Sequence, residues 1–231
     1  MKNWLFALLF AAFTNAVHAE ESAQPNSYAR ISADGKTAIA TVSPHASGIA
    51  IDVVARGGNA VDAAIAAAFT LGVVDGHNSG IGGGCFILVR LADGRIFAID
   101  GREMAPAAAQ RDMFLTDGKA NPELSRTGAL AVGIPGSVMA LHKLQQLGGA
   151  LKFRDLILPA ANLAETGFPI SVSLAERLSA TSKRLAQFPA SAAIFLDKDN
   201  QPLPANSQLQ QKDLAATYRA IAKQGPAYFY Q

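Results

Sequence analysis

A fifteen-residue apolar segment, followed by a glycine-rich turn, constrains the fold of this chain more than any other feature. Asn59 is a favourable helix N-cap, and Asp62 occupies the acidic position of a capping box. Residues 60–74 are apolar at twelve positions, and Asp62 is their one charge. A helix that is apolar on every side is buried, and fifteen residues are too few to span a bilayer. The sequence therefore predicts a core helix over 60–74.

The turn that follows contains five glycines within residues 76–84. Such density indicates positive φ angles or a close backbone approach. The order of the residues does not fit a P-loop or a dinucleotide fingerprint, because the glycines follow a helix, enter a strand and lack the P-loop lysine. Ser79 is also misplaced for the nucleophile of a G-x-S-x-G elbow. A structural turn and an anion-binding nest of amides both stay open, and the turn is favoured.

Two strands, 85–91 and 95–100, are predicted next, joined by a hairpin through Asp93-Gly94. They are mostly apolar on both faces, which is typical of inner strands in a layered sheet. Arg102 lies just past the second strand, and its planar guanidinium suits a substrate carboxylate. An internal ion pair of Arg102 with Asp100 or Glu103 is the alternative, and without further context it is the favoured one.

Three segments, in this order and spacing, resemble the γ-glutamyltranspeptidase family, whose members are also called glutathione hydrolases. They are 57–64 (GGNAVDAA), 79–86 (SGIGGGCF) and 100–108 (DGREMAPAA). Further segments agree over nearly the whole chain after residue 36: 127–141, 156–171 and 213–230. The resemblance implies an α+β fold, the αββα sandwich of the N-terminal-nucleophile hydrolases, here incomplete because 37–231 match part of the large subunit. Two departures surround the turn, with Asp75-Gly76 in place of a common Glu-Pro and Cys85 in place of a common Gly.

The resemblance also implies a function and a substrate-binding residue. The arginine of the DGRE segment, here Arg102, would hold the α-carboxylate of the γ-glutamyl group in a donor such as glutathione. The acyl group would pass to a Thr and then to water or an amino acid. That Thr opens the small subunit in the family, and no matching segment occurs here. No catalytic residue is therefore assigned, and we expect the chain alone to be inactive. We do not assign the nucleophile to Thr37, Thr41, Thr70 or Thr127.

We therefore expect a fragment of a γ-glutamyltransferase that is truncated at its C-terminal end and needs two partners. These are the rest of the large subunit and the Thr-bearing small subunit. Two alternatives stay open: a related acylase with a glutaryl-type donor, and a non-catalytic carboxylate-binding or assembly half of a split protein. No cofactor and no metal are expected, because His45 and His77 lack partners at metal-ligand spacing. His142 is expected at a surface or an interface.

The first nineteen residues have the pattern of a cleavable signal peptide, cut after Ala19, which predicts a periplasmic or secreted protein. Residues 20–36 are predicted to be a flexible mature N-terminus. The net charge of +2 gives no electrostatic case for nucleic acid or for a membrane surface. Cys85 is the sole cysteine, so no internal disulfide can form, and its apolar setting favours a buried, unreactive thiol.

Turn and cap signals predict the remaining elements. Ser43 and Pro44 begin a helix that Gly57 ends, and residues 129–132 form a strand. A helix follows Pro135-Gly136, and another has Pro159 in its first turn and stops at Gly167. The last two helices are expected at 172–187 and before Gly225-Pro226, on either side of a loop at 197–208.

Overall fold

The computed structural model describes residues 28–231, so the predicted signal peptide lies outside the described residues. Within this range the helices are α1 (Pro44–Ala55), α2 (Ala60–Val74), the 3-10 helix η1 (Ala129–Ala131), α3 (Ser137–Gly148), α4 (Phe153–Thr166), α5 (Val172–Leu185), α6 (Pro189–Phe195), α7 (Lys212–Gln224) and α8 (Ala227–Tyr230). The strands are β1 (Ala29–Ile31), β2 (Ala38–Ala40), β3 (Cys85–Arg90), β4 (Ile96–Gly101), β5 (Leu115–Thr116), β6 (Lys119–Ala120), β7 (Phe168–Pro169) and β8 (Gln208–Leu209).

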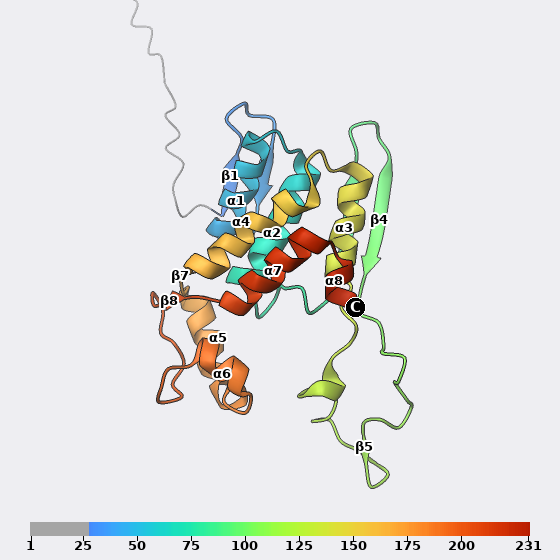
Figure 1. Ribbon diagram of the computed structural model, residues 1–231, viewed down its shortest axis with the longest axis vertical. Coiled ribbons are helices and arrows are strands. Elements are labelled where there is room, and N and C mark those ends of the chain that lie inside the picture. The colour runs from blue at the N-terminus through green and yellow to red at the C-terminus, as the bar shows by residue number, and fades with distance from the viewer. Residues whose placement is uncertain (1–27) are drawn as a thin grey trace, which may run out of the picture.

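Helix α2 lies at the centre of the fold, with α1, α3 and α4 packed around it (Figure 1). Its predicted bounds are confirmed, and eleven of its fifteen residues are buried. The predicted capping box is also present. The Asn59 side chain accepts hydrogen bonds from the N–H groups of Val61 and Asp62, and the Asp62 carboxylate accepts one from the Asn59 N–H at 2.9 Å. The cap thus fixes where the core helix begins.

The same cap joins α2 to the segment after α3. The Asp62 carboxylate is fully buried and also accepts hydrogen bonds from the N–H groups of Ala150 (2.9 Å) and Leu151 (3.3 Å). The Asn59 side-chain amide donates to the Gly148 carbonyl at 2.7 Å. A buried carboxylate is tolerated when its oxygens accept hydrogen bonds, as those of Asp62 do. Because these bonds join the start of α2 to the segment after α3, Asp62 fixes the position of the two helices relative to each other.

A second layer is formed by α4 and α7, and α4 packs against both α2 and α7. Tyr218 on α7 is completely buried, and its hydroxyl donates to the Phe69 carbonyl on α2 at 3.0 Å. The two rings meet edge to face with centroids 5.3 Å apart. Burial raises the pKa of the Tyr218 phenol far above its usual value, so the ring stays neutral.

The predicted hairpin is confirmed as β3 and β4, an antiparallel pair in which Cys85 faces Gly101 and Arg90 faces Ile96. Ile87, Val89 and Ile99 pack against the helical core. The opposite face is apolar and open to solvent, with Phe86, Leu88 and Ile96 between 64% and 78% exposed. Within residues 28–231 this sheet has two strands, and no described element covers its outer apolar face.

Three sequence predictions are corrected. Helix α4 begins at Phe153 and contains Pro159 in its interior, not in its first turn, because Phe153, Leu156 and Ile157 bury their side chains in the core and extend the helix backwards. Residues 129–131 form a 3-10 turn rather than a strand. The segment 20–36, predicted to be flexible, overlaps β1, which pairs with β2, so the ordered part begins before residue 37.

Other predicted boundaries agree closely with the structure. Pro44 is at the first position of α1, and Gly57 follows its C-cap with φ +91°. Gly167 caps α4, and Gly225 caps α7. The segment between β4 and α3 extends away from the helical body and contains β5 and η1 (Figure 1). No helix of the described residues is both long and apolar enough to cross a membrane.

Candidate functional site

The site around Arg102 is formed by three chain segments that meet at one end of the hairpin. The pairing of Cys85 with Gly101 places the glycine turn directly beside Arg102. The Gly83 carbonyl accepts hydrogen bonds from the N–H groups of Gly136 (3.0 Å) and Ser137 (3.2 Å), and from the Ser137 hydroxyl (3.0 Å). The glycine turn, the end of β4 and the start of α3 therefore form one hydrogen-bonded unit.

Two glycines are required by this close approach. A Cβ atom at Gly84 would lie 2.6 Å from the Gly101 carbonyl oxygen and 2.8 Å from the Arg102 Cα. A Cβ atom at Gly136 would lie 2.6 Å from the Gly101 carbonyl carbon. Such distances are shorter than carbon atoms tolerate, so any other residue would push the backbone before Arg102 out of place. This geometry favours the structural interpretation of the glycine turn, which the sequence had left open beside an anion nest.

The position of Arg102 follows from the alternation of side chains along the hairpin. Phe86 pairs with Asp100, and Arg102 lies two residues past Asp100, so the three side chains share one face. The Arg102 N–H donates to the Asp100 carboxylate at 3.0 Å. The Arg102 guanidinium carbon lies 5.8 Å from the centroid of the Phe86 ring, within cation–π range. Backbone and ring together orient the arginine.

The predicted ion pair is present with one of the two expected partners. Arg102 Nη2 lies 3.2 Å from Glu103 Oε2, while Asp100 contacts the backbone of Arg102 rather than its guanidinium. The Arg102 side chain is 55% exposed, and among the described residues Glu103 is the one carboxylate that its guanidinium contacts. An arginine has five N–H donors, so this group keeps donors for an external carboxylate. The pair and the substrate contact are therefore compatible.

Arg102 also lines a cavity of about 510 Å³ between β4, α3 and α8. Its wall is largely apolar, with Ile99, Met104, Ile134 and Met139. Tyr230 closes one side, where its hydroxyl accepts a hydrogen bond from the Met139 N–H at 3.2 Å. Burial raises the pKa of the Tyr230 phenol. Tyr230 was not predicted to line a site, and the aromatic cluster 228–230 is the signal that could have indicated it.

The cysteine and the histidines of the described residues have structural surroundings. Cys85 is half-buried rather than fully buried as predicted, and burial raises the pKa of its thiol. His77 Nε2 lies 3.4 Å from Asp75 Oδ1, and the rings of His45 and His142 pack edge-on against Phe168 and Phe153. Residues 28–231 contain no group of three or more His, Cys, Asp or Glu side chains placed to hold a metal.

The threonines that the sequence analysis set aside lie elsewhere in the fold. The Thr41 hydroxyl hydrogen-bonds Ser43 and Ser47, and the Thr70 hydroxyl donates to the Ala66 carbonyl within α2. None of Thr37, Thr41, Thr70 and Thr127 lines the cavity at Arg102. No described threonine is therefore placed beside Arg102 as a nucleophile.

The sequence profile of the family described as gamma-glutamyltranspeptidase matches residues 46–231. The chain belongs to the γ-glutamyltranspeptidase family. It is 40% identical over 237 aligned residues to a glutathione hydrolase proenzyme of Bacillus subtilis (strain 168), an alignment that covers 98% of this chain and 39% of that protein. The chain thus spans about two fifths of the length of this relative.

Solved structures agree with this assignment. The γ-glutamyltranspeptidase of Helicobacter pylori superposes with a TM-score of 0.80 at 40% identity, over 83% of this chain and 55% of that one. A cephalosporin acylase from Bacillus halodurans superposes with a TM-score of 0.69 at 25% identity, over 80% of this chain and 35% of the acylase. The predicted α+β fold of the N-terminal-nucleophile hydrolase type is confirmed.

Proposed function

We propose that this chain is the Arg102-bearing part of the large subunit of a γ-glutamyltransferase. The complete enzyme transfers the γ-glutamyl group of a glutathione-like donor to water or to an amino acid. The observation that supports this proposal is the state of Arg102: half exposed, oriented by Phe86 and Asp100, and with free donors. The similarity to glutathione hydrolases supports the substrate class.

In this proposal Arg102 binds the α-carboxylate of the donor. A guanidinium meets a carboxylate through two parallel hydrogen bonds, which fixes orientation as well as position. Glu103, which now pairs with Arg102, is itself partly exposed, so its pair with Arg102 is weak. The substrate carboxylate can therefore take the free donors of Arg102 without breaking a buried interaction.

The nucleophile comes from elsewhere in this proposal. Acyl transfer through a covalent intermediate needs a hydroxyl next to a base, and in the resembled family both belong to a Thr exposed by self-cleavage. This chain spans 39% of the length of the Bacillus subtilis relative, which supports a further polypeptide segment that contains the Thr. That segment and the rest of the large subunit are the proposed partners.

The donor class can be tested with the full-length gene product. The proposal predicts faster hydrolysis of a γ-glutamyl anilide than of the matching glutaryl anilide, which lacks the α-amine. Preference for the glutaryl donor would instead indicate an acylase, the function that the likeness to a cephalosporin acylase favours. The same preparation tests localisation, because the proposed periplasmic or secreted protein would have a mature N-terminus at Glu20.

A non-catalytic half of a split protein is the remaining alternative, and the nucleotide sequence downstream of Gln231 discriminates it. An in-frame continuation with a Thr-led segment would support the proposed enzyme. A separate adjacent reading frame with that segment would indicate a split enzyme. The absence of both would favour a carboxylate-binding or assembly module, and it would contradict the proposed activity.

A further inference from the structure

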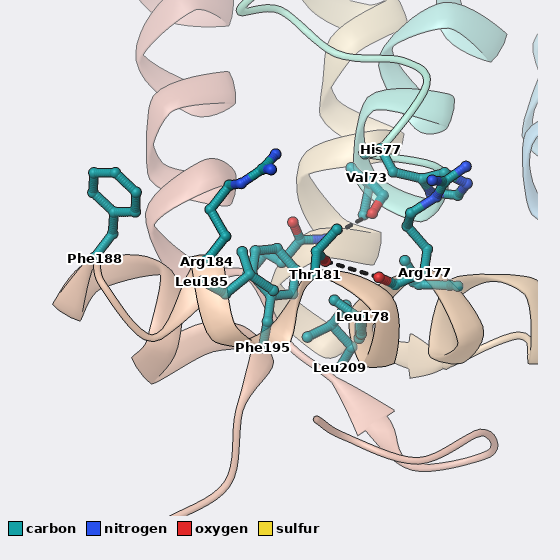
Figure 2. A pocket seen from close by; sticks show the side chains of 13 residues that line it. Val73, His77, Arg177, Leu178, Thr181, Arg184, Leu185, Phe188, Phe195 and Leu209 are labelled. Atoms are coloured by element: carbon teal, nitrogen blue, oxygen red, sulfur yellow. Dashed lines mark hydrogen bonds between the residues drawn. The ribbon is translucent and has the colours of Figure 1, made fainter. Parts of the chain in front are cut away.

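A second cavity, of about 490 Å³, lies between the C-terminal end of α2, the helices α5 and α6, and strand β8 (Figure 2). It shares no lining residue with the cavity at Arg102. Its volume is in the range of small-molecule sites, which is about 300–1,000 Å³. We call it the α5 cavity, and no step of the proposed transfer reaction uses it.

The inner wall of the α5 cavity is apolar. Val73, Leu174, Leu178 and Leu209 belong to the buried core and present side-chain surface to the cavity. Gln211 covers a backbone acceptor at the end of α2, because its side-chain amide donates to the Val73 carbonyl at 2.7 Å. The wall therefore offers hydrocarbon contact, and the Val73 carbonyl is already occupied by a donor.

The rim of the α5 cavity is basic. Arg177, Thr181 and Arg184 lie on one face of α5 because they are spaced by four and three residues. Figure 2 shows both arginines reaching up from α5 on either side of Thr181, with Arg177 toward His77. No Asp or Glu lines the cavity, although Asp75 lies 3.4 Å from His77.

The two arginines lack counter-charges. Among the described residues neither Arg177 nor Arg184 forms an ion pair. Exposed arginines on a helix are commonly just solvated. Here, however, two unpaired guanidiniums stand over a hydrocarbon-lined hollow, and the Thr181 hydroxyl is already engaged with the Arg177 carbonyl at 2.8 Å. The free donors at the rim are therefore cationic.

We propose that the α5 cavity binds a small amphipathic carboxylate. The apolar body of the ligand lies against Val73, Leu178 and Leu209, and its carboxylate lies between Arg177 and Arg184. Charge complementarity selects an anion over an alcohol or an amine, because a charge-assisted hydrogen bond is about twice as strong as a neutral one. The leucine wall selects ligands with an alkyl or aryl body over compact anions such as acetate.

The test uses the purified full-length gene product and three ligands of one shape: 4-phenylbutyrate, 4-phenylbutanol and 4-phenylbutylamine. Isothermal titration calorimetry measures the three affinities, with acetate as a compact anion. We expect the carboxylate to bind about tenfold more tightly than the alcohol or the amine, with acetate weakest. The double variant Arg177→Ser/Arg184→Ser should lose that preference. Lys183→Ser/Lys198→Ser removes the same charge outside the cavity and should keep it.

A second variant tests the site without removing the arginines. Thr181→Glu places a carboxylate four residues after Arg177 and three before Arg184, where it pairs with both along the helix. We expect loss of 4-phenylbutyrate binding with an unchanged or raised melting temperature. Equal binding of the acid and the alcohol would overturn the proposal. So would equal weakening in the lysine control, or full binding of the acid to Thr181→Glu.

Discussion

At the level of single residues, the proposed donor binding depends on the contacts that position Arg102 and on the donors that its guanidinium keeps free. Its backbone is fixed by Asp100 and by the close packing at Gly84 and Gly136, while its guanidinium rests near Phe86. The one carboxylate that pairs with it, Glu103, is solvent-accessible, and exposed pairs contribute about 0–1 kcal/mol to stability. Arg102 is thus well positioned, and its side chain contributes little to the stability of the described fold.

Replacing Arg102 should therefore affect the donor far more than the fold. A charged contact left unmade costs about 2–4 kcal/mol, so Arg102→Ala should lower kcat/KM for a γ-glutamyl anilide by roughly 30- to 1000-fold in the full-length gene product. Arg102→Lys should recover part of this loss, because one ammonium cannot form the bidentate contact. Unchanged kinetics with a lower melting temperature would instead make the pair with Glu103 the function of Arg102.

His45 gives a residue-scale prediction on pH. Burial lowers the pKa of His45, so the unfolded chain binds a proton there at a pH where the folded chain does not. Stability should be complete above the unfolded pKa of about 6.5 and fall as the pH decreases below it. His45→Gln should flatten this acid slope in urea denaturation measured between neutral and mildly acidic pH.

The slope should not vanish in that variant, because burial also lowers the pKa of His142. An identical slope in the variant and the parent chain would contradict the assignment of the effect to His45. The ring packs against Phe168, so the comparison uses the change of stability with pH rather than the absolute stability at one pH.

At the scale of elements, local signals predicted those boundaries that caps and glycines set by themselves. The bounds of α2 followed from Asn59, Asp62 and an unbroken apolar run. The predicted start of α4 near Pro159 was wrong. The preference of proline for the first turn of a helix is outweighed by the burial of Phe153, Leu156 and Ile157. Residues 129–131 lack a strand partner, and the chain turns at Gly128, whose φ is +89°. The apolar pattern of 129–132 does not indicate this turn.

The capping box of α2 should contribute more to stability than any exposed helix cap in the chain. Asp62→Ala removes the buried carboxylate that accepts hydrogen bonds from the N–H groups of Asn59 and Ala150. We expect a loss of about 2–4 kcal/mol of unfolding free energy, seen as a lower urea midpoint at unchanged slope. Asp213→Ala, in the exposed first turn of α7, is the matched control and should cost less than about 1 kcal/mol. Equal losses would contradict the structural role of Asp62.

At the scale of the whole molecule, the hairpin is the element that the described residues leave least complete. The sequence predicted inner strands, and the structure places one of their faces on the helices and the other in solvent. The convergence of the glycine turn, Arg102 and the start of α3 could not be read from the sequence, because Gly83 and Gly136 are far apart along the chain. The proposed role of Arg102 comes from the family resemblance, and the structure shows its surroundings.

The exposed apolar face of the hairpin predicts self-association of the isolated chain. Open strand edges beside uncovered Leu88 and Ile96 favour pairing with further strands. Size-exclusion chromatography of the chain alone should therefore show oligomers or aggregates. Leu88→Thr/Ile96→Thr should shift the elution toward the monomer, whereas Leu130→Thr, at an exposed site outside the hairpin, should not. A monomeric parent chain would contradict this prediction.

In the proposed function, this chain supplies the donor-binding arginine and takes its nucleophile from another segment. The most direct measurement is hydrolysis of a γ-glutamyl anilide by residues 20–231 alone, beside the full-length gene product. We expect turnover by the full-length product and none by residues 20–231, since loss of a nucleophile leaves little more than binding and polarisation. Turnover by residues 20–231 that disappears when one of Thr37, Thr41, Thr70 or Thr127 is replaced would contradict it.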